Sequence, residues 1–210
     1  MKKVIIIGDG GHARLVADII EAARKYSIAG YTSIDRTENR LYDHPLLGDD
    51  SILPELLEKG LTNVAIGIGG YRDNHLRKEI FMKAKSLGFN IITAIHPAAV
   101  ISTRSTIEEG SVIFPGVIIN NNVQIGKNSI VATGSTIDHD TVVEDHVLVS
   151  AGVTVGATVR IREGALIALG AKIISGLEIG GNVILGAGSV AVKNCIDPGT
   201  YLGIPAKKKM

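Results

Sequence analysis

The sequence predicts two successive folds, an α/β domain and then a parallel β-helix. Up to about residue 94, short apolar runs that end in glycine alternate with amphipathic stretches, a pattern typical of a parallel sheet with flanking helices. From residue 99, aliphatic residues recur every six positions, and a long repeat of this kind is typical of a parallel β-helix. Aromatic residues make up only 4% of the chain, so the core must consist of Ile, Val, Leu and Ala.

The elements of the first part follow from these rhythms. We expect strands at Lys3–Gly8, Ser27–Ser33, Asn63–Gly69 and Phe89–Ile95, and helices at His12–Tyr26 and Arg72–Gly88. One stripe of the first helix should face the sheet, and it consists of Leu15, Val16, Ile19, Ile20 and Ala23.

The repeat of the second part runs without an insertion. Steps of six from Ile101 to Ala191 meet sixteen aliphatic residues, and a second column from Ser105 to Cys195 is almost entirely small or β-branched. An ordinary alternating strand would not keep a period of six across its turns. Pro198 and Gly199 then break the repeat, so the tail should cap the exposed end of the β-helix.

Composition excludes several classes of protein. The 210 residues carry a net charge of +1 and no basic stripe, which gives no electrostatic case for nucleic-acid binding. The apolar run near the N-terminus is too short for a membrane span and lacks the features of a signal peptide. Cys195 is the single cysteine, which excludes an internal disulfide and fits a reducing compartment. We therefore expect a cytoplasmic protein.

Four short motifs carry a family resemblance. They are "GDGGH" (Gly8–His12), "HPAAVI" (His96–Ile101), "DHD" (Asp138–Asp140) and "GIPAK" (Gly203–Lys207). Together they resemble the hexapeptide-repeat sugar O- and N-acetyltransferases, which include sialic acid O-acetyltransferase and the acetyltransferase of bacillosamine synthesis. The resemblance implies a Rossmann-like domain at 1–95, a left-handed β-helix with eighteen residues per coil at 96–194, and a capping tail at 195–210.

The resemblance also implies a function. The first expectation is acetyl-CoA-dependent N-acetylation of a UDP-linked 4-amino-4,6-dideoxy sugar by a homotrimer without a metal. The alternatives are O-acetylation of sialic acid or a related sugar, and a non-catalytic β-helix protein that binds a nucleotide sugar. A γ-class carbonic anhydrase needs three zinc-binding histidines, whereas the coils contain only His139 and His146. A nucleotidyltransferase would need a Gly-rich, basic nucleotide loop that the first part lacks.

His139 is the candidate catalytic residue. Acetyl transfer needs a base to take the acceptor's proton, and a histidine with an adjacent carboxylate suits that role. Because His139 follows the inward Ile137 by two residues, it should point out of the coil, so the site would form against a neighbouring subunit. The resemblance makes His139 the general base, Asp140 the acid that raises its basicity, and Asp138 a second flanking acid.

The family's second histidine lies nine residues after the base, where this chain has Leu148. We expect Leu148 to line the acetyl pocket and His146, seven residues after the base, to lie at the surface or in an interface. By the resemblance, the backbone at Leu169 and Ala187 holds the pantetheine arm of the coenzyme. Lys207, Lys208 and Lys209 either approach the coenzyme phosphates or are simply solvated.

The glycine-rich turn suggests a nucleotide-sugar site. Backbone N–H groups of such a turn can face an anion at a helix N-terminus, but Ala13 stands where a dinucleotide motif has its third glycine. The resemblance implies that the nucleotide sugar contacts Gly10, Gly11, His12, Gly67 and Gly69; a simple tight turn is the alternative. The family has two acids after the second strand, where Ser33 and Ile34 stand here, so Asp35 becomes the candidate for nucleoside contact.

Overall fold

The computed structural model describes residues 1–35, 41–70 and 73–209. The chain divides into two compact units, one of Met1–Gly70 with Leu76–Pro97 and one of Tyr71–His75 with Ala98–Met210. Within the described residues, no helix combines the length and apolar character that a membrane span requires.

The first unit contains a parallel five-stranded sheet with the order β3-β2-β1-β4-β5. The strands are β1 (Lys2–Ile7), β2 (Tyr26–Thr32), β3 (Leu46–Gly48), β4 (Asn63–Ile66) and β5 (Asn90–Ile91). The helices are α1 (Gly11–Ala23), the 3-10 helix η1 (Asp50–Ile52), α2 (Leu53–Glu58) and α3 (His75–Leu87). Strand β1 is central because its residues from Val4 to Ile7 are apolar and buried, as expected for a strand covered on both faces.

Several expectations for this unit need correction. The helix expected to reach Tyr26 ends at Ala23, and the strand expected to reach Gly69 ends at Ile66. Leu15 does not face the sheet: its side chain is 46% exposed, and Ala13 and Ala17 are buried on that stripe instead. The run from Phe89 to Ile95 is not one strand, because β5 ends at Ile91 and a separate strand, β6 (Ala94–Ile95), follows. Helix α3 begins at His75 rather than at Arg72, which lies outside the described residues.

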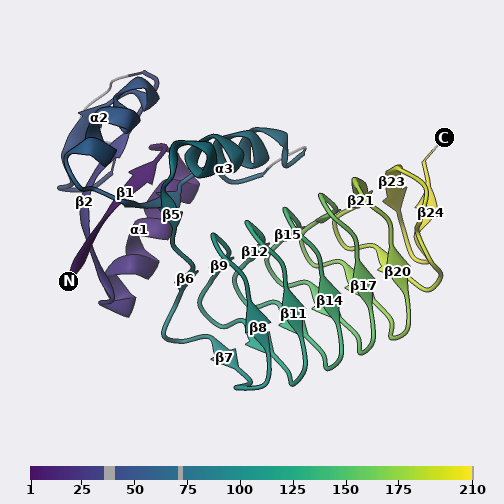
Figure 1. Ribbon diagram of the computed structural model, residues 1–210. Helices are drawn as coiled ribbons and strands as arrows, with labels where there is room; N and C mark the ends of the chain where they lie inside the picture. The colour runs from purple at the N-terminus through teal and green to yellow at the C-terminus, as the bar shows by residue number, and fades with distance from the viewer. Residues whose placement is uncertain (36–40, 71–72, 210) are drawn as a thin grey trace. The chain divides into compact units, whose positions relative to one another are not determined.

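The second unit is a left-handed parallel β-helix, which confirms the predicted fold class (Figure 1). Three sheets form its sides. The first sheet holds β7 (Val100–Ile101), β10 (Ile118–Ile119), β13 (Thr136–Ile137), β16 (Thr154–Val155), β19 (Lys172–Ile173) and β22 (Val190–Ala191). The second holds β8 (Thr106–Ile107), β11 (Gln124–Ile125), β14 (Val142–Val143), β17 (Arg160–Ile161) and β20 (Glu178–Ile179). The third includes β9 (Val112–Ile113), β12 (Ile130–Val131), β15 (Leu148–Val149), β18 (Leu166–Ile167), β21 (Val183–Leu185), β23 (Gly199–Leu202) and β24 (Lys207–Lys208).

The coils stack in a strict register of eighteen residues. Thr136 pairs with Ile118 and Thr154, Val142 with Gln124 and Arg160, and Leu148 with Ile130 and Leu166. The second residue of each two-residue strand in the coils points inward, as does Leu185 at the end of β21, and these aliphatic side chains are almost completely buried from Ile113 to Ala191. This column is the core that the six-residue repeat predicted.

Hydroxyl groups join successive coils at several corners. The Ser129 hydroxyl donates to the Glu144 carbonyl at 2.9 Å and accepts from the Val147 N–H at 3.1 Å. Ser111, Ser135 and Thr141 each make the same pair of bonds to backbone groups of the coil that follows their own. These residues belong to the small column of the repeat and are fully buried, so each hydroxyl satisfies backbone groups that would otherwise lose a partner.

Corner geometry explains which polar residues the coils carry. Every sixth residue from Gly110 to Gly188 has a positive φ, and the residues other than glycine there are Asn122, Asn128, Asp140, His146, Thr158 and Asn182. Asn, Asp and His tolerate this left-handed conformation better than most residues. The corners therefore collect the polar side chains of the β-helix, including those of the candidate site.

The tail closes the β-helix. Strand β23 pairs in parallel with β21, and β24 turns back to pair antiparallel with β23. Figure 1 shows these two yellow strands at the C-terminal end of the coil stack. They extend the third sheet by two strands beyond β21.

Candidate active site

His139 lies at a corner between the first and second sheets. It follows β13 and precedes β14, and its side chain is 48% exposed. Its Nδ1 lies 2.7 Å from Oδ2 of Asp140. Because an ionised carboxylate only accepts hydrogen bonds, Nδ1 donates to it. The neutral ring is therefore protonated on Nδ1, and its Nε2 can accept a proton.

Two asparagines from the preceding coil hold the acids on either side. Asn122 donates through Nδ2 to Oδ1 of Asp140 at 2.6 Å, and Asn120 donates to Oδ1 of Asp138 at 2.7 Å. The backbone N–H of His139 also donates to Oδ1 of Asp138 at 2.8 Å. Each asparagine lies eighteen residues before its acid, a spacing visible in the sequence that our prediction did not use.

These contacts polarise the histidine. The hydrogen bond to Asp140 raises the pKa of His139 above its ordinary value, and the negative charges of both neighbouring acids add to this. The bond from Asn122, and then that from His139, lowers the pKa of Asp140. The bond from Asn120 has the same effect on the pKa of Asp138. Both acids are thus ionised at neutral pH, and His139 is more basic than a free histidine.

His146 does not lie at the surface of the protomer, which was one of the two places expected for it. It is only 5% exposed, and its Nδ1 lies 2.8 Å from Nδ2 of Asn128, which is also buried. Both occupy left-handed corners between the second and third sheets, eighteen residues apart, which stacks one side chain on the other. The position is therefore a buried corner of the β-helix.

Leu148 lies away from His139 within one protomer. It is on β15 in the third sheet, in a buried outward column with Ile130 and Leu166. The third sheet does not meet the corner that carries His139, because that corner joins the first sheet to the second. The two residues can share a site only if they come from different subunits.

The expected coenzyme column lies at the corner between the third and first sheets. Leu169 is 61% exposed and Ala187 is also exposed. The Leu169 carbonyl accepts from the Gly188 N–H at 2.8 Å, and the Ala151 carbonyl accepts from the Gly170 N–H at 3.0 Å. This column and His139 lie at opposite edges of the first sheet. The expected lysines Lys207, Lys208 and Lys209 are exposed in the tail.

Glycines gather at the carboxyl ends of β1 and β4. The strand order reverses between these two strands, and ligands of open α/β sheets bind at such a point. A Cβ on Gly67 would come within 2.8 Å of the Ala13 Cβ and the Ile7 carbonyl, so only glycine fits there. A Cβ on Gly69 would come within 3.3 Å of the His12 side chain, whereas a Cβ on Gly10 would meet open space and one on Gly11 would lie 3.9 Å from the Arg14 guanidinium, at the start of α1.

His12 is uncharged beside these glycines. Burial, together with the positive charge of Arg77 on α3, lowers the pKa of His12 to about 4. The ring can therefore donate one hydrogen bond and accept another at neutral pH. Burial also lowers the pKa of Arg77, but a guanidinium keeps its charge at neutral pH.

A serine that follows β2 contacts an acid from the loop after β1. Ser33 is 2% exposed, and its hydroxyl donates to Oδ2 of Asp9 at 2.7 Å. Ile34 is 80% exposed and Asp35 is also exposed in the turn that follows. Our sequence analysis identified Ser33 and Asp35 but gave no role to Asp9.

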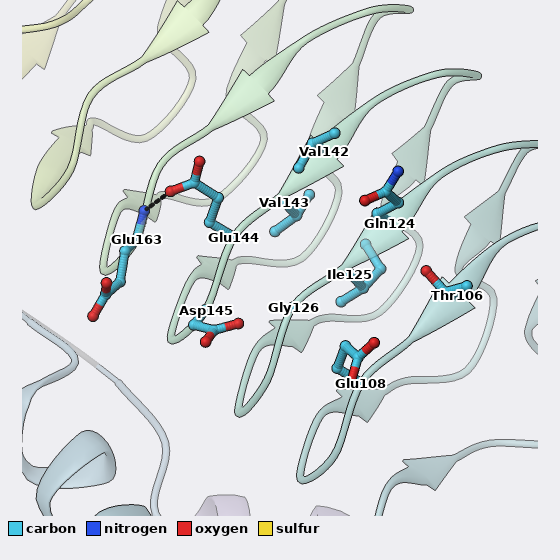
Figure 2. Close-up of a pocket in the computed structure, with 10 residues that line it drawn as sticks. All are labelled: Thr106, Glu108, Gln124, Ile125, Gly126, Val142, Val143, Glu144, Asp145 and Glu163. Carbon is cyan, nitrogen blue, oxygen red and sulfur yellow. Dashed lines mark hydrogen bonds between the residues drawn. The ribbon is translucent and has the colours of Figure 1, made fainter.

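An acidic groove of about 350 Å³ lies on the second sheet. Figure 2 shows the carboxylates of Glu108, Glu144, Asp145 and Glu163 gathered along it. Glu144 accepts from Arg160 at 2.9 Å, from Arg162 at 3.3 Å and from the backbone N–H of Glu163 at 3.1 Å. The groove does not include His139, and its acidic lining disfavours a ligand that carries phosphates.

Comparison with known proteins agrees with both halves of this description. The PglD N-terminal domain family matches residues 3–84, and the bacterial transferase hexapeptide family matches residues 104–139. The curated UDP-N-acetylbacillosamine N-acetyltransferase of Bacillus subtilis (strain 168) is 32% identical over 121 residues. That match spans 54% of this chain and 51% of the relative, so the chain matches about half the length of this relative.

Two solved structures match over nearly the whole chain. A mutant of GDP-perosamine N-acetyltransferase from Caulobacter crescentus, in complex with CoA and GDP-perosamine, is 35% identical with a TM-score of 0.94, covering 99% of this chain and 97% of the other. The acetyltransferase domain of PglB from Neisseria gonorrhoeae FA1090 is 30% identical with a TM-score of 0.92, covering 100% of both chains.

The α/β unit joined to hexapeptide coils, with an exposed histidine–carboxylate pair at a corner, defines the class of hexapeptide-repeat acyltransferases. Within that class, the chain belongs to the sugar N-acetyltransferase family of PglB and perosamine N-acetyltransferase. It is therefore an enzyme.

Proposed function

We propose that the chain transfers the acetyl group of acetyl-CoA to the amino group of a nucleotide-linked 4-amino-4,6-dideoxy sugar, with His139 as the general base. The observation that carries this proposal is the 2.7 Å contact between His139 Nδ1 and Asp140. The relatives support the substrate class, because one was solved with CoA and GDP-perosamine and another with acetyl coenzyme A.

The chemistry follows from the geometry of the pair. Nε2 of His139 takes a proton from the sugar amine as its nitrogen attacks the thioester carbonyl carbon. Asp140 stabilises the imidazolium that forms. When the tetrahedral intermediate collapses, the C–S bond breaks, the acetyl group remains on the nitrogen, and the thiolate of coenzyme A receives the proton.

The same proposal assigns the ligand contacts. Gly10, Gly11, His12, Gly67 and Gly69 would hold the nucleotide sugar, with Asp35 nearby, in a Rossmann-like unit whose strand order supports that description. Leu169 and Ala187 would hold the pantetheine arm, and Leu148 would line the acetyl pocket.

We further propose a homotrimer with sites between its subunits. Its support is that Leu148 and the coenzyme column lie away from His139 within one protomer. The enzyme would work in the cytoplasm, where acetyl-CoA is available and Cys195, which is a free, buried thiol, stays reduced.

A thiol-release assay tests the proposal. The purified chain is given acetyl-CoA with UDP- and GDP-linked 4-amino-4,6-dideoxy sugars or with sialic acid. We expect release of coenzyme A with an amino sugar, and a fall in kcat of about 10²- to 10⁴-fold in His139→Ala.

His44→Ala is the matched control, because His44 also pairs with a carboxylate, Glu21, at 2.8 Å. It should keep its full kcat. Full activity in His139→Ala would disprove the general-base role, and release only with sialic acid would show that the enzyme acetylates a hydroxyl.

A further inference from the structure

Asp9 is an acidic residue within the turn that we propose to receive a nucleotide sugar. It lies between Gly8 and Gly10, directly after β1. A carboxylate close to the diphosphate would repel it. Its side chain must therefore be directed elsewhere if the site is to bind this ligand.

Ser33 gives the carboxylate its direction. The Ser33 backbone N–H donates to the Gly48 carbonyl at 2.9 Å, which fixes this buried residue at the end of β2. Its hydroxyl then donates to Oδ2 of Asp9 at 2.7 Å. Asp9 is thereby drawn toward the end of β2, on the side of β1 opposite to β4 and its glycines.

The end of β2 is where an α/β sheet recognises ribose. When phosphates lie at the start of the helix after β1, the sugar reaches the end of β2, and an acid there accepts a hydrogen bond from the 2′-hydroxyl. In this chain that position holds Ser33. We propose that Asp9, supplied by the loop after β1, is the acceptor for the ribose hydroxyl of the nucleotide sugar, and that Ser33 is its positioning residue.

This assignment rests on the proposed function, and nucleotide binding tests it directly. Calorimetry measures the affinity of the full-length protein for GDP, UDP and their 2′-deoxy analogues. We expect the better-bound ribonucleotide to bind about 10- to 100-fold more tightly than its deoxy analogue, since hydrogen bonds to charged groups are the stronger ones.

Variants then locate the acceptor. Asp9→Asn should lose most of the preference for the ribonucleotide over its deoxy analogue, because only the affinity for the ribonucleotide falls. Ser33→Ala should lose part of this preference. Both variants should keep an unchanged KM for acetyl-CoA. Glu58→Gln removes an exposed acid from the same unit and should change nothing.

The proposal fails if the wild-type protein binds ribo- and deoxyribonucleotides equally, a measurement that needs no folded variant. It also fails if Asp9→Asn keeps the preference. If no nucleotide binds and no coenzyme A is released with any amino sugar, the proposed function itself is wrong.

Discussion

At the scale of single residues, the site depends on a ladder of side chains eighteen residues apart. Asn120 and Asn122 hold Asp138 and Asp140, and these in turn hold His139. The charge-assisted bonds keep the base in one tautomer although it is exposed to water. In the proposed mechanism, the asparagines would therefore act on the chemistry through the acids that they hold.

The raised pKa of His139 predicts a pH dependence. Only the neutral ring is a base, so kcat/KM should rise as the pH passes upward through this raised pKa. In Asp140→Asn the carboxylate is absent, so the pKa should fall toward its ordinary value of about 6.5 and the rise should move to lower pH.

Asp138→Asn is the comparison for this pH profile, because Asp138 affects the pKa of His139 only through its charge. Asp138→Asn should shift the rise of kcat/KM along the pH axis by less than Asp140→Asn does. A rise that stays in place in Asp140→Asn would show that another group controls it.

The sequence pointed to some residues of the candidate site and not to others. The chemistry of an acid–His–acid motif pointed to His139 and Asp140. The expectation that His146 lies at the surface was wrong because it ignored backbone conformation: a residue at a left-handed corner stacks on the corner of the preceding coil. Asp9, which we propose as the ribose acceptor, received no role because its partner, Ser33, lies 24 residues away along the chain.

At the scale of elements, the hydroxyl bridges predict which coil substitutions are costly. Ser129→Ala would leave the Val147 N–H and the Glu144 carbonyl without their hydroxyl. We expect a loss of about 1–3 kcal/mol in the free energy of unfolding, measured with urea at a fixed protein concentration.

Thr154→Ala is the matched control, since Thr154 is exposed on the first sheet. It should change the free energy of unfolding by less than about 0.5 kcal/mol. Equal losses in the two variants would mean that the buried bridges contribute no more than a surface hydroxyl.

The individual elements also show where the periodicity of the sequence predicts structure and where it does not. The β-helix strands were predictable because every coil repeats the same inward aliphatic position. Strand β3 and helix α2 are short, three and six residues, so neither spans enough residues to show a period. Leu15 was misassigned because small residues, Ala13 and Ala17, take the buried stripe of α1 beside it.

At the scale of the whole molecule, the separation of His139 from the coenzyme column predicts complementation between subunits. His139→Ala and Leu169→Glu should each be inactive. Trimers refolded from an equal mixture should recover about a quarter of the wild-type activity, because each site needs an intact base from one protomer and an intact column from its neighbour.

Absence of recovered activity in mixed trimers would place the whole site within one protomer. Light scattering of the wild-type protein provides the second check, since an active species with the monomer mass of 22.1 kDa would also contradict a shared site. No spacing in the sequence determines how subunits meet. The outward direction of His139 suggested only that a neighbouring subunit completes the site, and the trimer itself was expected from the family resemblance.

The register of eighteen residues also determines which changes in chain length the β-helix can accept. Insertion or removal of one complete coil leaves every inward aliphatic residue, bridging hydroxyl and left-handed corner in phase with its neighbours. A single inserted residue instead turns the inward side chains outward until the phase is restored. Whole coils can therefore be added or removed without loss of register, and the corner that carries His139 keeps its geometry wherever such a coil is added beyond it.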